Sequence, residues 1–350
     1  MRNMANVLKN FKAKNTVKRP MSEAPNSRLV PLSDFGSNPG NLSAWQYVPD
    51  GVPAYAPLVV VLHGCTQTAA EYDIGSGWSE VADKHGFALL FPEQRKSNNP
   101  RLCFNWFSPV DITRGQGEVM SINQMVSTMF RRHSLDRSKT FITGLSAGGA
   151  MAGAMMATYP ELFGGGAIIA GLPYATASTV SEAFARMRGR GVQESDMLAD
   201  RVRNASDHKG PWPSVSVWHG TADRTVDPVN MEAIIAQWYS LHAIERPPTT
   251  GTVDGHSVRR WRNAEGVAVI KAYSIKDMAH GVPIQTSGLQ TAGSARAFML
   301  DVGISSTWHI AKSWDLIQDE AVTSEKPYAH RTQFLDIVIE KAIRAVGLIR

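Results

Sequence analysis

Two kinds of segment alternate along the chain. Continuous apolar runs, rich in β-branched residues and ending in turns, occupy residues 57–64, 87–94, 140–144, 165–171, 215–220 and 267–274. A shorter strand-like stretch covers Ala44–Val48, within a region rich in proline, serine, asparagine and glycine. Because the longer runs are apolar at every position and not at every second one, they predict strands that are buried on both faces.

Helical patterns fill the spaces between these runs, at residues 76–86, 117–133, 147–159 and 229–242. Strands that alternate with helices predict an α/β fold, with a mostly parallel central sheet and helices on both faces. We expect a basic tail and loop over residues 1–40, and one domain over residues 41–350 that closes with an amphipathic helix at 331–347. The polar, irregular segment 173–212 interrupts the alternation, and we expect it to be an insertion or lid over the site.

The charge of the chain is concentrated at its start. The formal net charge of the 350 residues is +5, but the first twenty hold no acid and six bases: Arg2, Lys9, Lys12, Lys14, Lys18 and Arg19. The remaining 30 basic residues (36 minus 6) stand against 31 acids, so the body is close to neutral and does not support nucleic-acid binding. No apolar run reaches the roughly 20 residues of a transmembrane helix.

The basic start of the chain allows two interpretations. Met4, Leu8 and Phe11 form an apolar stripe between lysines, so residues 1–14 could associate with a membrane or another apolar surface. Because isolated helices of this length are marginal, we favour a frayed basic tail. The stretch lacks the compact apolar core of a secretory signal, and a cytoplasmic location is the default expectation.

The candidate chemistry starts at the sequence Gly144-Leu145-Ser146-Ala147-Gly148, which follows an apolar strand and opens a helical segment. This context is typical of the turn that exposes a nucleophilic serine. Small neighbours suit a strained backbone, and the helix N-terminus directs amide hydrogens at the reacting centre. An ordinary glycine-rich turn is the alternative interpretation.

A base and an acid would complete the nucleophile hypothesis, because a serine hydroxyl needs a base to take its proton and a carboxylate to hold that base. His280 in KDMAHGVP lies just past one strand, and Asp223 in HGTADRTVDP follows another. Parallel strands present their carboxyl ends at one edge of the sheet. Ser146, Asp223 and His280 are therefore predicted to meet there, in the chain order of the hydrolases.

Other residues compete for these roles. His256, with Asp254 beside it, is the rival base, but it precedes the last strand of the sheet instead of following it. Asp227 is the rival acid, but it stands before a proline and resembles a helix cap. His63 and His219 end strands in His-Gly turns, where we expect local packing or hydrogen bonds.

The negative charge that develops on a substrate carbonyl needs two preset donors. The amide of Ala147, which follows the nucleophile, is one candidate, and the amide of Cys65 in the strand-ending turn HGCTQ is the other. An ordinary turn is the alternative for this second segment. The chain has two cysteines, Cys65 and Cys103, and composition alone leaves open whether they form a disulfide or two buried thiols.

With these residues assembled, the chain resembles the polyhydroxybutyrate-depolymerase family of esterases in the α/β-hydrolase superfamily. The resemblance spans about residues 57 to 316 and is highly specific when its segments are taken together: LHGCTQTAAEYDIGSGW, FPEQ, NPRLCFNWF, RGQGE, TGLSAGGAM, AGLPY, HGTAD and DVGISSTWHIAKSWDL. One segment departs from the family. Ala279 precedes His280 and Val282 follows the glycine, where relatives more often carry glycine and tryptophan.

The resemblance implies a serine carboxylic-ester hydrolase with the α/β-hydrolase fold. The family's nucleophile, acid and base map onto Ser146, Asp223 and His280, and its oxyanion donors map onto the amides of Cys65 and Ala147. It implies neither a metal nor a cofactor, and it makes an extracellular or periplasmic location the alternative to the cytoplasm.

The family also indicates a substrate class, since its members cleave hydroxyalkanoate chains, small acyl esters, or feruloyl and acetyl groups of plant polysaccharides. We expect hydroxyalkanoate oligomers or small acyl esters; the alternatives are a feruloyl or acetylxylan esterase, and an acyltransferase on the same scaffold. Trp106, Tyr174 and Trp308 are predicted to line an aromatic cleft, with core packing as the other interpretation. Similar proteins imply a disulfide between Cys65 and Cys103.

Overall fold

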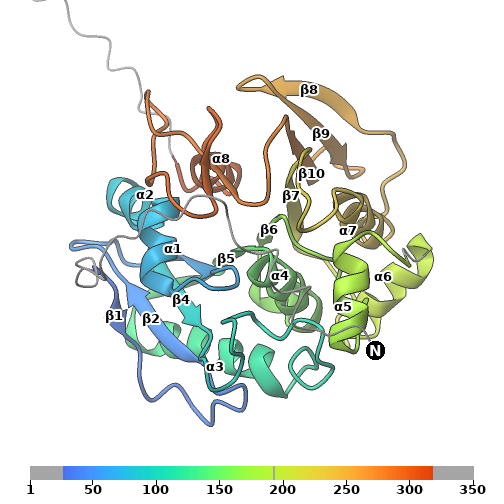
Figure 1. Ribbon diagram of the computed structural model, residues 1–350. Helices are drawn as coiled ribbons and strands as arrows, with labels where there is room; N and C mark the ends of the chain where they lie inside the picture. The colour runs from blue at the N-terminus through green and yellow to red at the C-terminus, as the bar shows by residue number, and fades with distance from the viewer. Residues whose placement is uncertain (1–26, 192–193, 318–350) are drawn as a thin grey trace, which may run out of the picture.

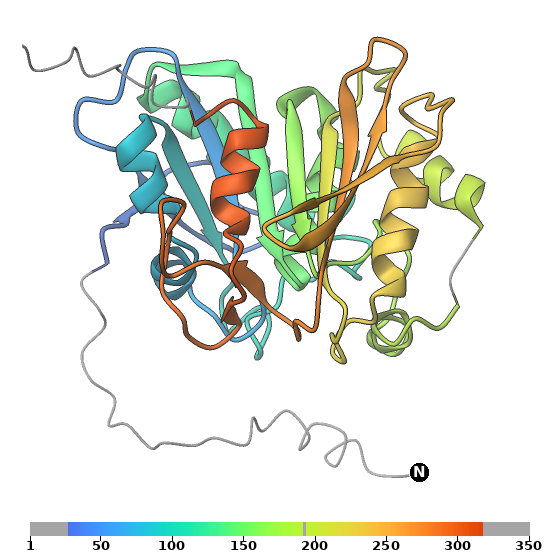
Figure 2. The same cartoon turned by 90° about the horizontal axis from the view of Figure 1, so that it is seen from above.

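The three-dimensional structure is a computed structural model that describes residues 27–191 and 194–317. Residues 1–14 and the helix predicted at 331–347 lie outside this part of the chain. The described residues form three layers, in which a twisted sheet lies between two groups of helices (Figure 1, Figure 2).

The described residues build a ten-stranded sheet in the order β1-β2-β4-β3-β5-β6-β7-β10-β9-β8. The central strands from β4 to β10 pair in parallel, and antiparallel strands flank them on both sides, which confirms the predicted sheet. The strands are β1 (Val30–Pro31), β2 (Ser43–Tyr47), β3 (Ala56–Leu62), β4 (Ala88–Glu93), β5 (Leu135–Leu145), β6 (Gly165–Ile169), β7 (Ser214–Gly220), β8 (Thr249–Val253), β9 (His256–Arg262) and β10 (Ala268–Ile275).

Helices cover both faces of the sheet, as the alternating pattern predicts. One apolar core joins the sheet to α3 (Gly117–Arg132), α4 (Ala147–Thr158), α6 (Ser195–Arg203) and α7 (Val229–Tyr239). A second core, on the other face, joins it to α1 (Ala69–Ser76), α2 (Trp78–His85) and α8 (Ser306–Ser313), and α8 crosses the front of the sheet in Figure 2. The other described elements are the short 3-10 helix η3 (Pro160–Leu162), the helix α5 (Val180–Met187), and a small parallel pair, β11 (Val282–Ile284) and β12 (Met299–Asp301).

The helix predicted at 76–86 corresponds to α2, and the structure adds α1, which was not predicted, directly before it. α1 ends at Gly77, whose φ of 74° is left-handed, and α2 begins directly after it. A Cβ on Gly77 would lie 2.2 Å from the backbone nitrogen of Gly293. The break therefore rests on a backbone contact with a distant part of the chain, which no local pattern reveals.

The segment 173–212 is more regular than its polar composition predicts, because it forms α5 and α6. Leu198, Ala199 and Val202 of α6 are buried, and α6 packs against α7 and α4. This half of the segment is part of the helical layer of the domain. The hairpin of β8 and β9 was not predicted either, since β8 is exposed along most of its length and carries no apolar run.

The sheet register brings the candidate residues to one edge. Leu145 at the end of β5 pairs with Ile169, Ile169 pairs with Trp218 of β7, and Trp218 pairs with Tyr273 of β10. The parallel strands β5, β6, β7 and β10 therefore end side by side. Side chains that follow these strands are available to one site, as is usual at the carboxyl edge of an α/β sheet.

Candidate active site

Ser146 occupies the turn between β5 and α4. Its backbone has φ 56° and ψ −116°, a conformation that residues other than glycine rarely adopt. The turn is held in place because the Ser146 amide donates to the Ile169 carbonyl at 2.8 Å, and the Ser146 carbonyl accepts from Ala150 at 2.9 Å. Backbone strain that the surrounding structure enforces is typical of functional sites.

The glycines of this turn allow its backbone to pack closely. A Cβ on Gly144 would lie 2.4 Å from the carbonyl of Gly148. A Cβ on Gly148 would lie 2.4 Å from the carbonyl oxygen of His63, at the end of β3. Any larger residue at these positions would push Ser146 away from the neighbouring strand end. The glycine-serine-glycine pattern thus has a physical cause in this fold.

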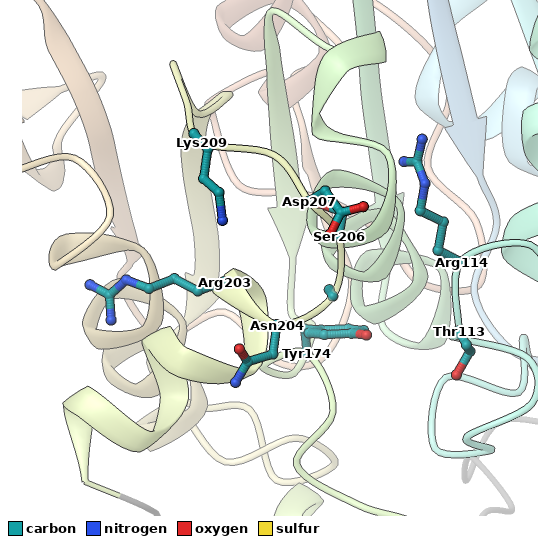
Figure 3. A pocket seen from close by; sticks show the side chains of 9 residues that line it. Thr113, Arg114, Tyr174, Arg203, Asn204, Ser206, Asp207 and Lys209 are labelled. Carbon is teal, nitrogen blue, oxygen red and sulfur yellow. The ribbon is translucent and has the colours of Figure 1, made fainter.

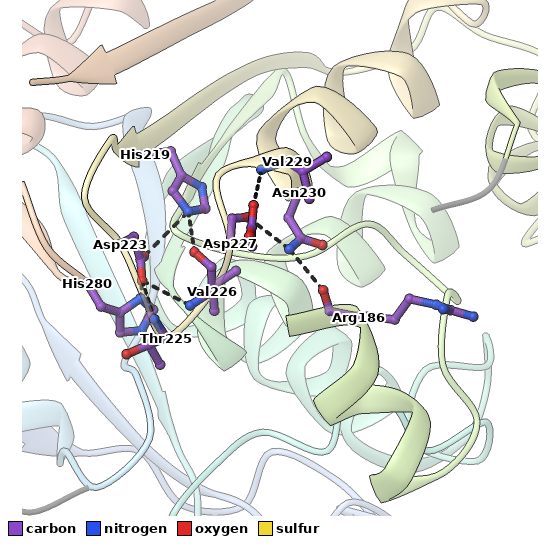
Figure 4. A network of polar contacts seen from close by, with 9 residues as sticks. All are labelled: Arg186, His219, Asp223, Thr225, Val226, Asp227, Val229, Asn230 and His280. Carbon is purple, nitrogen blue, oxygen red and sulfur yellow. Dashed lines mark hydrogen bonds and ion pairs between the residues drawn. The ribbon is translucent and has the colours of Figure 1, made fainter. Parts of the chain in front are cut away.

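Asp223 lies in the loop after β7, where its carboxylate is buried and accepts several hydrogen bonds (Figure 4). Oδ1 accepts from the amides of Thr225 at 2.8 Å and Val226 at 2.9 Å. Oδ2 accepts from Nδ1 of His280 at 2.7 Å. This bond fixes the imidazole as the Nδ1–H tautomer and leaves Nε2 with the lone pair that a general base needs.

The loops that carry the acid and the base are also joined through their backbones. Thr221 donates to the carbonyl of Ile275 at 2.9 Å, and Ala222 donates to the carbonyl of Met278 at 3.0 Å. The predicted acid and base are therefore in contact. The strand of Ser146 ends at the same edge, two strand spacings or about 10 Å from β7.

A second histidine supports the acid. His219 is buried, and its Nε2 lies 2.9 Å from the Val226 carbonyl oxygen and 3.4 Å from Oδ2 of Asp223. The local hydrogen bond predicted for His219 is thus present, but its proximity to the acid was missed. Burial by itself raises the pKa of Asp223, but the hydrogen bonds from His219, His280 and Val226 outweigh it and hold that pKa below its usual range.

The candidate oxyanion donors lie on two neighbouring turns. Ala147 is the first residue of α4, so its amide has no partner within the helix. In the part of the chain that the structure describes, no hydrogen bond occupies the amide of Cys65 or Ala147, whereas the amides of Gly64, Thr66 and Gln67 are all bonded. Two unoccupied amides beside a candidate nucleophile are what an oxyanion hole requires.

A disulfide joins Cys65 to Cys103, across 38 positions of the sequence. Beside it, the Thr66 amide donates to the Arg101 carbonyl at 2.7 Å. The pairing implied by the family resemblance is thus present. It ties the turn that bears the Cys65 amide to the loop that precedes α3.

The same loop is anchored by buried polar residues for which the sequence predicted no role. Glu118 accepts from Gln94 Nε2 at 2.6 Å, from Asn105 Nδ2 at 2.8 Å and from the Asn105 amide at 2.9 Å. The backbone amide of Gln94 in turn donates to Nε2 of His63 at 3.1 Å, while Nδ1 of His63 donates to the Gly64 carbonyl at 2.7 Å. Burial lowers the pKa of His63 to about 4, so this link is made by a neutral ring.

The rival residues have other partners. His256 uses both ring nitrogens, one with the Val302 carbonyl at 3.0 Å and the other with the Lys276 amide at 3.2 Å. Asp227 accepts from the Val229 amide at 3.0 Å, where α7 begins, as expected of a helix cap. Both rivals are therefore engaged by local hydrogen bonds, away from the contact between His280 and Asp223.

The structure separates the three predicted aromatic residues. Trp106 is buried in an apolar cluster beside the nucleophile turn, with Ala147, Ala150, Leu172, Ala177, Ala183 and Val226. Trp308 lies half-buried on the first turn of α8, with Lys312 over its ring. Tyr174 is buried, and its hydroxyl donates to the Ile112 carbonyl at 3.2 Å. Of the three, Trp106 is the one that packs in the same cluster as Ala147, the residue that follows Ser146.

Tyr174 also lines a polar cavity of about 520 Å³ (Figure 3), together with Thr113, Arg114 and residues that follow α6. Arg114 donates to the carbonyl of Thr158 at the last residue of α4. Since α4 runs for 12 residues, or about 18 Å, the contact between Arg114 and Thr158 stands at the end of this helix remote from Ser146.

The described residues contain no group of histidine, cysteine, aspartate and glutamate side chains arranged to hold a metal ion. None of the helices in the described parts of the chain has the length and apolarity needed to cross a bilayer.

The fold is that of the α/β hydrolases. Among solved structures, an acetyl xylan esterase from Aspergillus awamori superposes with a TM-score of 0.70 over 83% of this chain and 99% of that one, at 22% sequence identity. An S-formylglutathione hydrolase from Agrobacterium tumefaciens superposes with a TM-score of 0.51 at 14% identity, over 85% of this chain and 99% of that one. At these identities the likeness concerns the fold alone.

Residues 42–299 match the family model described as esterase PHB depolymerase, and the chain belongs to this family. A poly(3-hydroxyalkanoate) depolymerase C of Paucimonas lemoignei is 44% identical over 83% of this chain and 70% of its own length. An acetylxylan esterase of Coprinopsis cinerea is 32% identical over 75% of this chain and 72% of its own length. The chain is a carboxylic ester hydrolase.

Proposed function

We propose that Ser146, His280 and Asp223 form a catalytic triad that hydrolyses carboxylic esters through an acyl-enzyme. The observation that carries the proposal is the 2.7 Å hydrogen bond from His280 Nδ1 to the buried carboxylate of Asp223, at the sheet edge where the strained Ser146 stands. The bond holds the imidazole in the tautomer that accepts a proton at Nε2.

The reaction proceeds in two halves. Oγ of Ser146 attacks the ester carbonyl while Nε2 of His280 takes its proton, and the amides of Cys65 and Ala147 stabilise the oxyanion. When the tetrahedral intermediate collapses, the carbon–oxygen bond to the alcohol breaks and His280 donates the proton to the departing oxygen. Water then attacks the acyl-serine with His280 again as base, and the acid leaves as Ser146 recovers its proton.

Hydroxyalkanoate oligomers or small acyl esters are the substrates we propose. The depolymerase relative at 44% identity supports this class. The buried cluster of Trp106, Ala147 and Ala150 supports it as well, because it places an apolar surface beside the serine. Acetylxylan and feruloyl esters are the second candidate class, favoured by relatives named for these activities at 32% and 28% identity.

The helix α5 belongs to the proposed substrate site. Ala183 of α5 packs in the cluster of Trp106, and the Met187 carbonyl accepts from Asp227 in the loop of the acid at 2.7 Å. We propose that α5, the first half of the predicted insertion 173–212, covers the acyl group of the substrate. The second half of the segment, α6, packs in the helical layer of the domain instead.

The test of the triad is the variant Ser146→Ala. Hydrolysis of a p-nitrophenyl ester is expected to fall by about three or more orders of magnitude, while the circular dichroism spectrum and unfolding midpoint stay unchanged. Ser313→Ala, at the end of α8, is the matched control and should retain full activity. A Ser146→Ala variant that keeps more than about a tenth of the activity would show that the nucleophile is misassigned.

The substrate class is tested by comparing kcat/KM on 3-hydroxybutyrate oligomers, methyl ferulate and acetylated xylan. The proposal expects the oligomers to be preferred. A preference for methyl ferulate or acetylated xylan would contradict the proposed substrate class and favour a feruloyl or acetylxylan esterase. It would not affect the proposed triad.

A further inference from the structure

Phe298 is a large apolar residue at a position where the backbone favours glycine. It is the third residue of a tight turn, in which the Met299 amide donates to the Arg296 carbonyl at 3.0 Å. Its φ is 64°, in the left-handed region that turns of this kind usually assign to glycine or asparagine. A bulky aromatic side chain there is a backbone outlier, and such outliers cluster at functional sites.

The turn is fixed directly to the segment that bears the proposed base. The Val282 amide, two residues after His280, donates to the Phe298 carbonyl at 2.8 Å. A Cβ on Gly281 would lie 2.7 Å from that same carbonyl oxygen, so the glycine after the histidine permits the close approach. Pairing of Val282 with Met299 in the β11–β12 ladder extends the attachment.

The side chain of Phe298 lies against the imidazole and faces solvent. The two ring centroids are 6.3 Å apart with an interplanar angle of 80°, while Phe298 remains 37% exposed. The protein therefore holds an apolar ring open beside its proposed base at the cost of backbone strain. Burial does not explain this ring, since much of its surface remains in water.

We infer that Phe298 contacts the alcohol part of the ester and favours substrates with an apolar alcohol. The inference rests on the proposed function, because His280 must donate its proton to the departing alcohol oxygen. That oxygen therefore lies next to the imidazole, and the group attached to it lies next to whatever flanks the imidazole. The acyl part faces the other wall, formed by the cluster of Trp106.

Two ester series test the inference. Acetates of methanol, butanol and benzyl alcohol vary the alcohol, and methyl esters of acetic, butyric and hexanoic acid vary the acyl group. Phe298→Gly is the main variant, because glycine suits the positive φ and removes the whole side chain without straining the turn. Phe298→Ala repeats the test with a different backbone preference, and Phe298→Tyr should preserve the selectivity.

In Phe298→Gly, the ratio of kcat/KM for benzyl acetate to that for methyl acetate is expected to fall about tenfold, while ratios within the acyl series stay within about twofold. Leu289→Ala is the matched control, since Leu289 lies fully exposed between β11 and the same turn. An unchanged benzyl-to-methyl ratio, or an equal change in both series, overturns the inference. The ratio is independent of the triad assignment, which Ser146→Ala tests through the loss of all hydrolysis.

Discussion

Glu118 is a carboxyl group that is buried among neutral hydrogen-bond donors. Its side chain is surrounded by the amide groups of Gln94, Asn98 and Asn105, with no cation among these partners. Burial raises the pKa of Glu118 to about 8, and the nearby charge of Asp111 adds to this effect. Above pH 4.5, the ordinary pKa of this carboxyl group, Glu118 has lost its proton in the unfolded chain. In the folded protein it keeps the proton until the pH approaches about 8.

This difference predicts a pH dependence of stability. Because the folded state binds more protons than the unfolded chain between pH 4.5 and about 8, the contribution of Glu118 to the free energy of unfolding is complete below pH 4.5 and decreases as the pH rises to about 8. Glu118→Gln cannot titrate. The free energy of unfolding of the wild type minus that of the variant should therefore decrease by on the order of a few kcal/mol across this pH range.

Urea unfolding at several pH values provides the measurement. Glu265→Gln, at an exposed position, is the control for removing a carboxylate from the surface. A difference between wild type and Glu118→Gln that stays constant or grows with pH contradicts the prediction.

Single residues differ in how far the sequence reveals them. Ser146 could be predicted because its glycine neighbours are a local sequence signal of a turn so closely packed that a Cβ on Gly144 or Gly148 would lie 2.4 Å from backbone atoms. The contact between Asp223 and His280 could be anticipated because parallel strands end at one edge of the sheet. The roles of His219, Glu118 and Phe298 could not, because each depends on partners distant in the sequence or on a backbone angle without a residue-type signal.

At the scale of elements, the disulfide and its loop set the position of one proposed oxyanion donor. The bond from Cys65 to Cys103 closes 38 positions of chain, and in the chain-entropy model such a loop contributes about 3–4 kcal/mol to stability. It also fixes the turn of the Cys65 amide against the loop before α3. Reduction of this disulfide should therefore lower both the free energy of unfolding and kcat.

Cys103→Ser is expected to lower the free energy of unfolding by about 3–4 kcal/mol and to reduce kcat more than it raises KM, since the oxyanion forms in the transition state. The chain has two cysteines, so a reductant acts on this bond alone. Wild type treated with dithiothreitol should behave as the variant does, and the variant should be insensitive to it. If dithiothreitol leaves the wild-type unfolding midpoint unchanged, or also shifts that of the variant, the prediction is wrong.

Helices and strands, like single residues, could be predicted where the sequence carries a local signal. The runs at 57–64 and 140–144 predicted β3 and the end of β5 because buried parallel strands need apolar residues on both faces. The hairpin of β8 and β9 carries no such run, since it lies at an edge of the sheet. α6 escaped prediction because its buried side is a short apolar stripe, Leu198, Ala199 and Val202, within a polar segment.

In the whole molecule, the loops of the candidate site follow strands that end at one edge of the central sheet. Strands β5, β7 and β10 end beside the proposed nucleophile, acid and base, and β3 ends beside the Cys65 turn. Loops from both halves of the sheet therefore have to close on the same point. The central claim is that this convergence activates a single serine among the many hydroxyl groups of the chain.

The most direct measurement of that claim is peptide mass spectrometry after treatment with a fluorophosphonate, which reacts with serines activated by a base. We expect one adduct, on the peptide that contains Ser146, with labelling abolished in Ser146→Ala and strongly slowed in His280→Ala. An adduct on another residue, or labelling of Ser146 at the wild-type rate in His280→Ala, would contradict it.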